Sequence, residues 1–289
     1  MMYELLIAPF VEFEFMRRAL VGACILSLSA CPIGVFLMLR RMSLTGDAMA
    51  HAILPGAAAG FLVSGLALLP MTIGGLLAGM LVALAAGAVS RLTVQREDAS
   101  LAAFYLISLA LGVLLVSLKG SSIDLMHVLF GTALALNTEA LVLIGTVATL
   151  TLAGLALLWR PLVAECMDPL FLQSVSRSGS VAHYAFLVLV VLNLVSGFQA
   201  LGTLLAVGLM MLPAATARFW CRDLEPMCLL AIVIGMISSL AGLLASYHLN
   251  MASGPSIILA AGLAYVVSIV FAPRGISRSH PKPHRHRTA

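Results

Sequence analysis

Two side chains that can bind a metal ion lie one helical turn apart in an otherwise apolar part of this chain. Asp47 and His51 have the i, i+4 spacing, so on a helix they share one face and can reach the same ligand. Ionisable groups are costly inside a membrane helix and usually serve a function there. A carboxylate and a neutral imidazole suit Mn2+, Zn2+ or Fe2+ better than Cu+, which prefers sulfur. The pair therefore predicts a divalent-metal site; the alternative is that Asp47 caps a helix start and His51 only packs.

Two donors are too few for a closed metal site, because zinc sites normally take three or four protein ligands. The missing ligands would come from elsewhere in the chain, or from a second copy in a two-fold dimer that offers two aspartates and two histidines. A transport site must also bind its ion weakly enough to release it. Three other histidines are poorer candidates because they lie near the ends of predicted spans: His127, His183 and His248.

The elements that hold the pair must be membrane helices. The chain has 289 residues, of which 62% are hydrophobic and 10% charged, and its mean hydropathy is +1.10. A soluble domain of this size cannot bury so much apolar surface, so we expect an all-α, polytopic membrane protein without a separate soluble domain. Apolar runs place nine spans at about 15–39, 47–69, 72–92, 100–118, 139–159, 183–198, 202–219, 227–247 and 256–272. Because the separator from Gly197 to Gly202 is thin, 183–219 could instead be one span and a broken helix, giving eight.

Basic residues alternate between the two sides of these spans. They follow the first, third, fifth, seventh and ninth spans, at Arg40 and Arg41, Arg91 and Arg96, Arg160 and Arg177, Arg218 and Arg222, and from Arg274 onward. The other loops hold only Lys119. By the positive-inside rule, this pattern predicts that the N-terminus is outside and the C-terminus is in the cytoplasm. The net charge of +4 then reflects membrane topology and not nucleic-acid binding.

The chain divides into one long apolar part and a short polar end. We expect a single transmembrane domain over residues 1–273 and a basic, histidine-containing cytoplasmic tail over residues 274–289. The composition of the tail predicts disorder; loose zinc binding by its histidines is the alternative.

Two predicted spans are interrupted by proline in a similar setting, at Pro55, which precedes Gly56, and at Pro213. Proline cannot donate to the carbonyl four residues back, so the carbonyls of His51 and Leu209 should be freed. Interrupted helices in both halves of a transporter point to its substrate path, although such kinks can also be merely tolerated. Small-residue spacings permit close helix contact at Gly56/Gly60 and Gly75/Gly79; the alternative is the ordinary tolerance of membrane helices for glycine.

Sequence signatures of enzymes are missing. There is no HExxH zinc-protease helix, no GxSxG elbow and no Walker A phosphate loop. The chain is therefore predicted not to be an enzyme, and any ATP-driven work would be powered by a separate chain. The stretch 165–172 combines acids, a proline and apolar residues. Its spacing fits a short amphipathic helix that lies on the membrane or docks into a cytoplasmic partner.

The stretch 40–56, which contains the Asp/His pair, closely resembles the signature of membrane permeases from bacterial zinc/manganese/iron ABC importers. The likeness continues through short blocks elsewhere in the chain, at 124–131, 168–171, 202–205, 212–218 and 253–255. Together these blocks cover about residues 15–273.

The resemblance implies an ABC importer permease fold, described for the family with about eight membrane helices, in the cytoplasmic membrane. Such permeases form two-fold dimers, bind two cytoplasmic ATP-binding subunits and receive metal from an external binding protein. Asp47 and His51 match the metal-coordinating residues of the family. The cytoplasmic helix that docks into the ATPase matches the stretch that contains Glu165, Asp168, Pro169 and Phe171.

The function expected from these features is ATP-driven import of Mn2+, Zn2+ or Fe2+ by alternating access, with no permanently bound cofactor. Residues 54–56 resemble the manganese/iron branch slightly more. Pro55, Gly56 and Pro213 would provide hinges or bare carbonyls along the path. The main alternative is a stand-alone secondary transporter or channel in which Asp47 or His51 relays protons. A permease for a large metal chelate would need a wide cavity and not an Asp/His pair.

Overall fold

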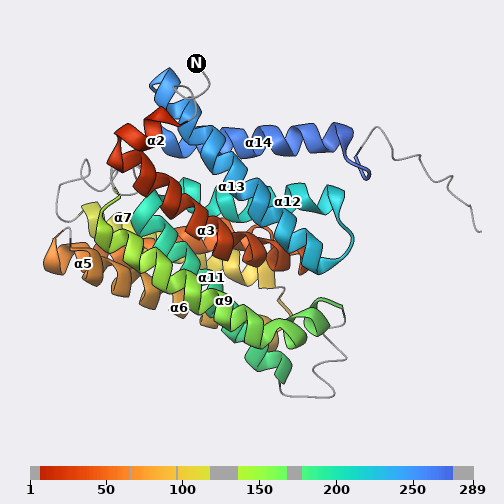
Figure 1. Ribbon diagram of the computed structural model, residues 1–289. Coiled ribbons are helices and arrows are strands. Elements are labelled where there is room, and N and C mark those ends of the chain that lie inside the picture. The colour runs from red at the N-terminus through yellow and green to blue at the C-terminus, as the bar shows by residue number, and fades with distance from the viewer. Residues whose placement is uncertain (1–6, 66, 96, 118–135, 168–177, 276–289) are drawn as a thin grey trace, which may run out of the picture.

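The computed structural model describes residues 7–65, 67–95, 97–117, 136–167 and 178–275, and every regular element in these ranges is an α-helix (Figure 1). The helices are α2 (Ala8–Glu12), α3 (Glu14–Leu39), α4 (Thr45–Ala52), α5 (Leu54–Ser64), α6 (Leu68–Leu92), α7 (Glu97–Ser117), α9 (Thr138–Met167), α11 (Ser178–Leu201), α12 (Thr203–Trp220), α13 (Leu224–Leu249) and α14 (Ser253–Phe271). The prediction of an all-α membrane protein is confirmed for these residues. All but two residues of the predicted tail, 274–289, lie outside the described ranges.

Within the described ranges, nine segments are long and apolar enough to cross a membrane, and α4 and α5 together form one of them. The nine predicted spans agree with these segments to within a few residues, apart from a longer α9. The uncertain stretch 183–219 forms two helices that are separated only by Gly202. The φ of Gly202 is 94°, a conformation that is strained for any residue with a side chain. The chain reverses there, because both His183 in α11 and Arg218 in α12 lie beside the C-terminal end of α3.

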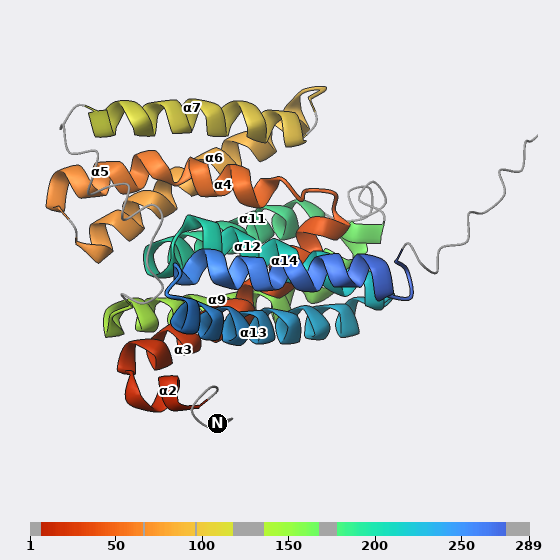
Figure 2. The same ribbon diagram turned by 90° about the horizontal axis from the view of Figure 1, so that it is seen from above.

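Two helices form the centre of the bundle. In the apolar membrane-spanning segments of α3 and α11, 72% of the residues are buried, compared with 22% in the corresponding segment of α7. Figure 2 shows α11 and α12 in the middle of the molecule, with α7 along one edge and α13 toward the other. The outer helices leave large apolar side chains exposed, among them Leu77, Leu106 and Leu263. Such exposure is expected where the surrounding solvent is lipid.

Glycines allow α5 and α6 to pack backbone to backbone. A Cβ atom added to Gly56 or to Gly74 would overlap the carbonyl of the other glycine, and one added to Gly60 would collide with the backbone at Pro70. The predicted close contact at Gly56/Gly60 is therefore confirmed. This packing fixes α5, and with it the position at which α4 ends.

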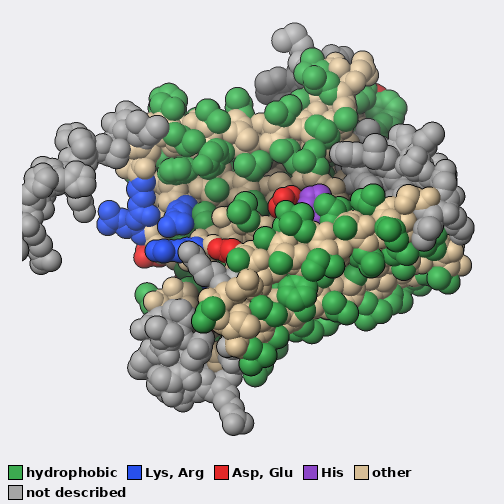
Figure 3. Space-filling model, turned by 180° about the vertical axis from the view of Figure 1, so that it is seen from behind, with side chains coloured by type: hydrophobic (Ala, Val, Ile, Leu, Met, Phe, Trp, Pro, Cys, Tyr) green, Lys and Arg blue, Asp and Glu red, His purple; other side chains and the backbone are tan. Residues whose placement is uncertain are grey.

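Arginines gather at one end of the bundle, which we call the arginine-rich end: Arg40, Arg218, Arg222 and Arg274. Figure 3 shows a blue group of basic side chains at one end of the visible face. One member of the group also links the C-terminal ends of α12 and α14, because Arg274 Nη1 donates a hydrogen bond to the Cys221 carbonyl over 3.0 Å. This is the end that the positive-inside rule assigns to the cytoplasm.

Candidate metal site

A tight turn places α4 directly after α3. The Met42 N–H donates to the Leu37 carbonyl over 2.8 Å and the Arg41 N–H to the Met38 carbonyl over 3.2 Å, which is the hydrogen-bond pattern of a Schellman cap. Arg41 has a φ of 60°, a left-handed conformation that costs a residue with a side chain roughly 1–2 kcal/mol. The turn is therefore closely defined, and it fixes where the short helix α4 begins.

The metal-binding pair projects from α4 onto an open surface. The distance between Asp47 Oδ1 and His51 Nε2 is 3.9 Å, and the two side chains are 70% and 41% exposed. On the face in Figure 3, an acidic and a histidine side chain lie side by side among hydrophobic ones. The expected shared face is therefore present, and both donors can be reached from outside this chain.

An aromatic ring of α7 supports the imidazole. Tyr105 stacks on His51 with ring centroids 6.2 Å apart and an interplanar angle of 29°. No local pattern in the sequence marks Tyr105, because its contact with His51 is made only where α7 packs against α4. Stacking restricts the ring orientation without occupying either nitrogen, so His51 remains able to bind a metal ion.

Pro55 ends the first helix of this span, as predicted. Helix α4 stops at Ala52, and Pro55 stands in the first turn of α5. Near the break, the Ser108 hydroxyl of α7 donates a hydrogen bond to the Ala52 carbonyl over 2.9 Å. Four residues along the same helix, Gly112 lies against Pro55. Helix α7 thus holds both sides of the break through Tyr105, Ser108 and Gly112.

The prediction that a proline interrupts the other span is wrong, because α12 runs unbroken from Thr203 to Trp220. Pro213 lies within α12 and is buried. The predicted free carbonyl of Leu209 accepts a hydrogen bond from the Cys31 thiol of α3 over 3.2 Å. The Leu209 carbonyl is therefore already hydrogen-bonded within the protein. A role for Pro213 along the transport path stays a prediction.

Glu165, predicted to lie in the ATPase-docking helix, is buried near the end of α9. Its Oε1 lies 2.5 Å from Arg40 Nη2, and their side chains are each 7% exposed. His183 joins them, since its Nδ1 is 2.7 Å from the same Arg40 nitrogen. We call Arg40, Glu165 and His183 the charged cluster. The other predicted docking residues, Asp168, Pro169 and Phe171, lie outside the described residues.

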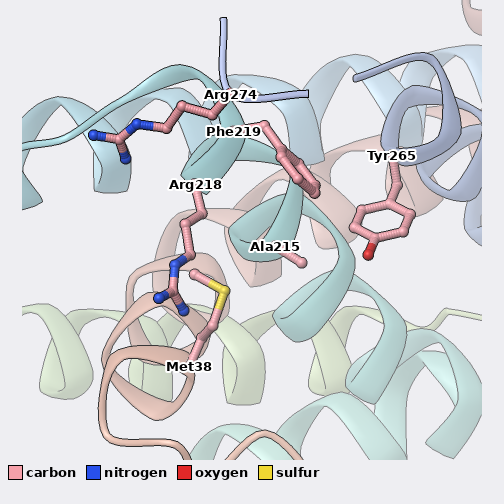
Figure 4. Close-up of a pocket in the computed structure, with 6 residues that line it drawn as sticks. All are labelled: Met38, Ala215, Arg218, Phe219, Tyr265 and Arg274. Atoms are coloured by element: carbon pink, nitrogen blue, oxygen red, sulfur yellow. The ribbon is translucent and has the colours of Figure 1, made fainter. Parts of the chain in front are cut away.

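In the part of the chain that the structure describes, no group of three or more His, Cys, Asp or Glu side chains could hold a metal ion. The cavity at the arginine-rich end, of about 370 Å³, is lined by Met38, Ala215, Arg218, Phe219, Tyr265 and Arg274 (Figure 4). Its lining has two guanidinium groups and no carboxylate or imidazole, so it does not suit a cation. The Asp47–His51 pair is therefore the metal candidate that the described residues offer.

Comparison with known proteins gives a consistent family. The model of the ABC 3 transport family matches residues 12–272. The manganese import system permease protein ScaB of Streptococcus parasanguinis is 34% identical over 269 residues, which are 93% of this chain and 95% of that protein. The chelated iron transport system membrane protein YfeD of Yersinia pestis is 28% identical, over 99% of this chain and 93% of its own length.

Among solved structures, PsaBC from Streptococcus pneumoniae, in complex with a Fab, has a chain that matches with a TM-score of 0.82 and 32% identity. The match covers 95% of this chain and 97% of the other. The fold is thus similar over nearly the whole length of both proteins.

Proposed function

The chain belongs to the ABC 3 transport family, and from this membership we propose that it is the membrane-spanning subunit of an ATP-driven importer for a divalent transition metal ion. The observation that carries the choice of cargo is the Asp47–His51 pair. Its two side chains are exposed on α4, in a bundle whose surface is otherwise mostly apolar. Oxygen and nitrogen donors of this kind suit Mn2+, Fe2+ and Zn2+.

The relatives favour manganese and iron as cargo. ScaB is named for manganese import and YfeD for transport of chelated iron. An exposed two-ligand site fits a free ion in passage better than a bulky chelate, which would need a wide cavity and few direct ligands. We therefore place Mn2+ first, Fe2+ second and Zn2+ third.

A second copy of the chain would complete the site. One chain offers two ligands, and the exposure of Asp47 and His51 leaves both accessible to a partner. A two-fold dimer that faces these surfaces together brings two aspartates and two histidines to its axis. Four donors make a site of ordinary coordination number, while the loss of one contact on opening would release the ion.

The transport cycle then follows from the placement of the pair. An external metal-binding protein delivers the ion to the dimer, and Asp47 and His51 replace part of its hydration shell. ATP-binding subunits act on the arginine-rich end, which we place in the cytoplasm. The break between α4 and α5 at Ile53 provides a joint at which the two helices can change their angle, an arrangement typical of transporters.

An ATP-driven importer is preferred to the stand-alone secondary transporter because the family match spans almost the whole membrane part of the chain. A secondary transporter would need no cytoplasmic ATP-binding partner. Co-purification of this chain with an ATP-binding subunit therefore supports the proposal, and transport by the isolated chain without ATP would argue for the alternative.

Metal uptake in cells tests the cargo and the site together. We expect Asp47→Ala and His51→Ala to lose uptake of one ion among 54Mn, 55Fe and 65Zn, at membrane expression matched to wild type. The matched control is His248→Ala, because His248 is exposed at the far end of α13, away from α4. It should transport within about two-fold of wild type, since isolated surface substitutions have small effects. Normal uptake by both site variants would show that the pair is structural.

A further inference from the structure

The charged cluster joins three helices at the arginine-rich end. Arg40 caps the C-terminal end of α3, Glu165 lies two residues before the end of α9, and His183 lies in the second turn of α11. One Arg40 nitrogen is within 2.5 Å of Glu165 Oε1 and 2.7 Å of His183 Nδ1. A guanidinium can only donate, so Nδ1 accepts in its contact with Arg40; the same Nδ1 lies 3.4 Å from Glu165 Oε1.

The cluster stands on an aromatic base supplied by the same helices. The Arg40 guanidinium lies 5.0 Å from the centre of the Phe186 ring, close enough for a cation–π contact. Phe186 and Trp159 each pack edge-on against Phe36, with centroids 6.1 Å and 5.4 Å from it. Each of α3, α9 and α11 therefore contributes one charged or polar group and one ring, so the three ends interlock.

Stability alone is a weak reason for such a cluster. A buried ion pair is often no more stabilising than apolar side chains of the same size. Here two buried polar atoms, Arg40 Nη1 and Glu165 Oε2, also have no hydrogen-bond partner among the described residues. What a buried charged pair gives and an apolar contact does not is a fixed geometry between helices.

A short, hydrogen-bonded stretch of backbone connects the charged cluster to the metal pair. From Arg40, the capped turn at Met42 leads into α4 through a hydrogen bond from the Thr45 N–H to the Met42 carbonyl, over 3.0 Å. Met42 itself is 5% exposed and anchored in the core. Six residues lie between Arg40 and Asp47, and hydrogen bonds of the backbone stabilise the turn that they form.

We propose that Arg40, Glu165 and His183 are positioning residues that make α4, with Asp47 and His51, move as one body with the adjoining ends of α9 and α11. A displacement of the α9 end by an ATP-binding partner is then transmitted through Arg40 to the metal pair. This inference rests on the proposed function, because the displacing force comes from ATP binding in a partner subunit. It assigns Glu165 to transmission inside the protein and not to direct contact with the partner.

The test is the number of metal ions imported for each ATP hydrolysed, with 54Mn as the probe. It is measured with the purified complex of this chain and its ATP-binding subunit in proteoliposomes that are supplied with the external metal-binding protein. Glu165→Gln removes one charge, and Arg40→Met/Glu165→Met removes both, so that no unpaired charge stays buried. We expect each variant to assemble and hydrolyse ATP, with the ratio of uptake to hydrolysis reduced at least about five-fold.

The chain contains a matched control. Glu14 and Arg18 form an ion pair with the same 2.5 Å contact at the other end of α3, but their side chains are 65% and 36% exposed. Glu14→Gln should keep the ratio within about two-fold of wild type. A wild-type ratio in both cluster variants would overturn the inference and leave the proposed function standing. Loss of assembly in both variants would also overturn it, by assigning the cluster to stability alone.

A second readout does not depend on the cargo. Hydrogen exchange of the α4 amides, compared with and without ATP, should change in the wild-type complex and stay constant in the two cluster variants. If the wild-type complex imports none of the three ions, the proposed function fails, and this readout still decides the inference. An equal response to ATP in wild type and variants would contradict it.

Discussion

In sequence the open Asp47–His51 pair lies only a few residues from Arg40 of the charged cluster, but the two groups have opposite environments in the protein. The open pair is 3.9 Å apart with side chains 70% and 41% exposed. In the charged cluster the ion pair is 2.5 Å apart, and all three side chains are at most 7% exposed. The open pair keeps ligand atoms available for a metal ion, whereas the charged groups of the cluster are paired with one another.

This difference separates two uses of ionisable groups in an apolar protein. A group that serves a passing ion must stay accessible and incompletely coordinated, because a saturated site has nothing to offer a ligand. A group that fixes the position of helices must be paired, because an unpaired buried charge costs several kcal/mol. The two proposals above therefore predict opposite balances between stability and transport for the two sites.

The largest effect is expected where a buried charge loses its partner. Glu165→Ala leaves the Arg40 guanidinium buried without an anion, which should lower the free energy of unfolding by about 3–5 kcal/mol. Thermal or denaturant unfolding of the purified protein in detergent measures this. The double variant Arg40→Met/Glu165→Met should recover most of the loss. If Glu165→Ala is as stable as wild type, the pair is not truly desolvated and the contrast with the open pair fails.

The open pair should show the reverse behaviour. His51→Ala removes a proposed metal ligand, so uptake should fall by about 100-fold or more, since even loss of an outer-shell partner costs 10–100-fold at metal sites. Because the side chain is 41% exposed, the free energy of unfolding should change by less than about 0.5 kcal/mol. Isotope uptake and unfolding in parallel measure both. A strongly destabilised variant with proportionate loss of uptake would indicate a packing role.

The same comparison extends to the two prolines: Pro55 stands at a helix break beside the open pair, whereas Pro213 lies within a continuous helix. Ser108→Ala removes the hydroxyl that donates to the Ala52 carbonyl, and hydrogen bonds between membrane helices contribute roughly 0.6–1.7 kcal/mol. We expect a loss of this size in the free energy of unfolding and a measurable drop in uptake, because the break positions α4. Ser108→Thr, which keeps the hydroxyl, is the control; equal losses in both variants would point to packing.

The smallest effect is expected near Pro213. Cys31→Ala removes the thiol that donates to the Leu209 carbonyl, but a thiol is a weak donor. The free energy of unfolding should fall by no more than about 1 kcal/mol, with uptake unchanged because Pro213 is buried within a continuous helix. Cys31→Ser should be at least as stable as Cys31→Ala. Loss of uptake in a stable Cys31→Ala protein would place Pro213 on the transport path.

Much of the fold could be predicted because a membrane limits what a chain can do. Apolar runs fix where helices cross, and arginines mark one end of the bundle, so the nine predicted spans agree with the structure to within a few residues outside α9. The doubtful pair at 183–219 was the exception, since hydropathy does not show whether Gly202 bends a helix or reverses the chain. The left-handed backbone at Gly202 and the packing of α11 against α12 settle it.

The candidate site was only partly predictable. The i, i+4 spacing was enough to place Asp47 and His51 on one face, because it depends on local geometry alone. Tyr105 and Ser108, which support that face, lie more than 50 residues away in sequence, and no local pattern marks them. His183 was expected near a membrane interface, yet it is 4% exposed; its burial depends on where α3 and α9 end.

Sequence alone thus determined the class of protein, the positions of most spans and the residues able to bind a metal ion, because hydropathy, charge and helical spacing act over one or two turns. Only the tertiary structure decided which charged residues are open and which are closed. Glu165 looked like a surface residue of a docking helix, and Asp47 looked like a buried acid; packing reversed both. Exposure is a property of neighbours that are distant in sequence, so it emerges only when the helices come together.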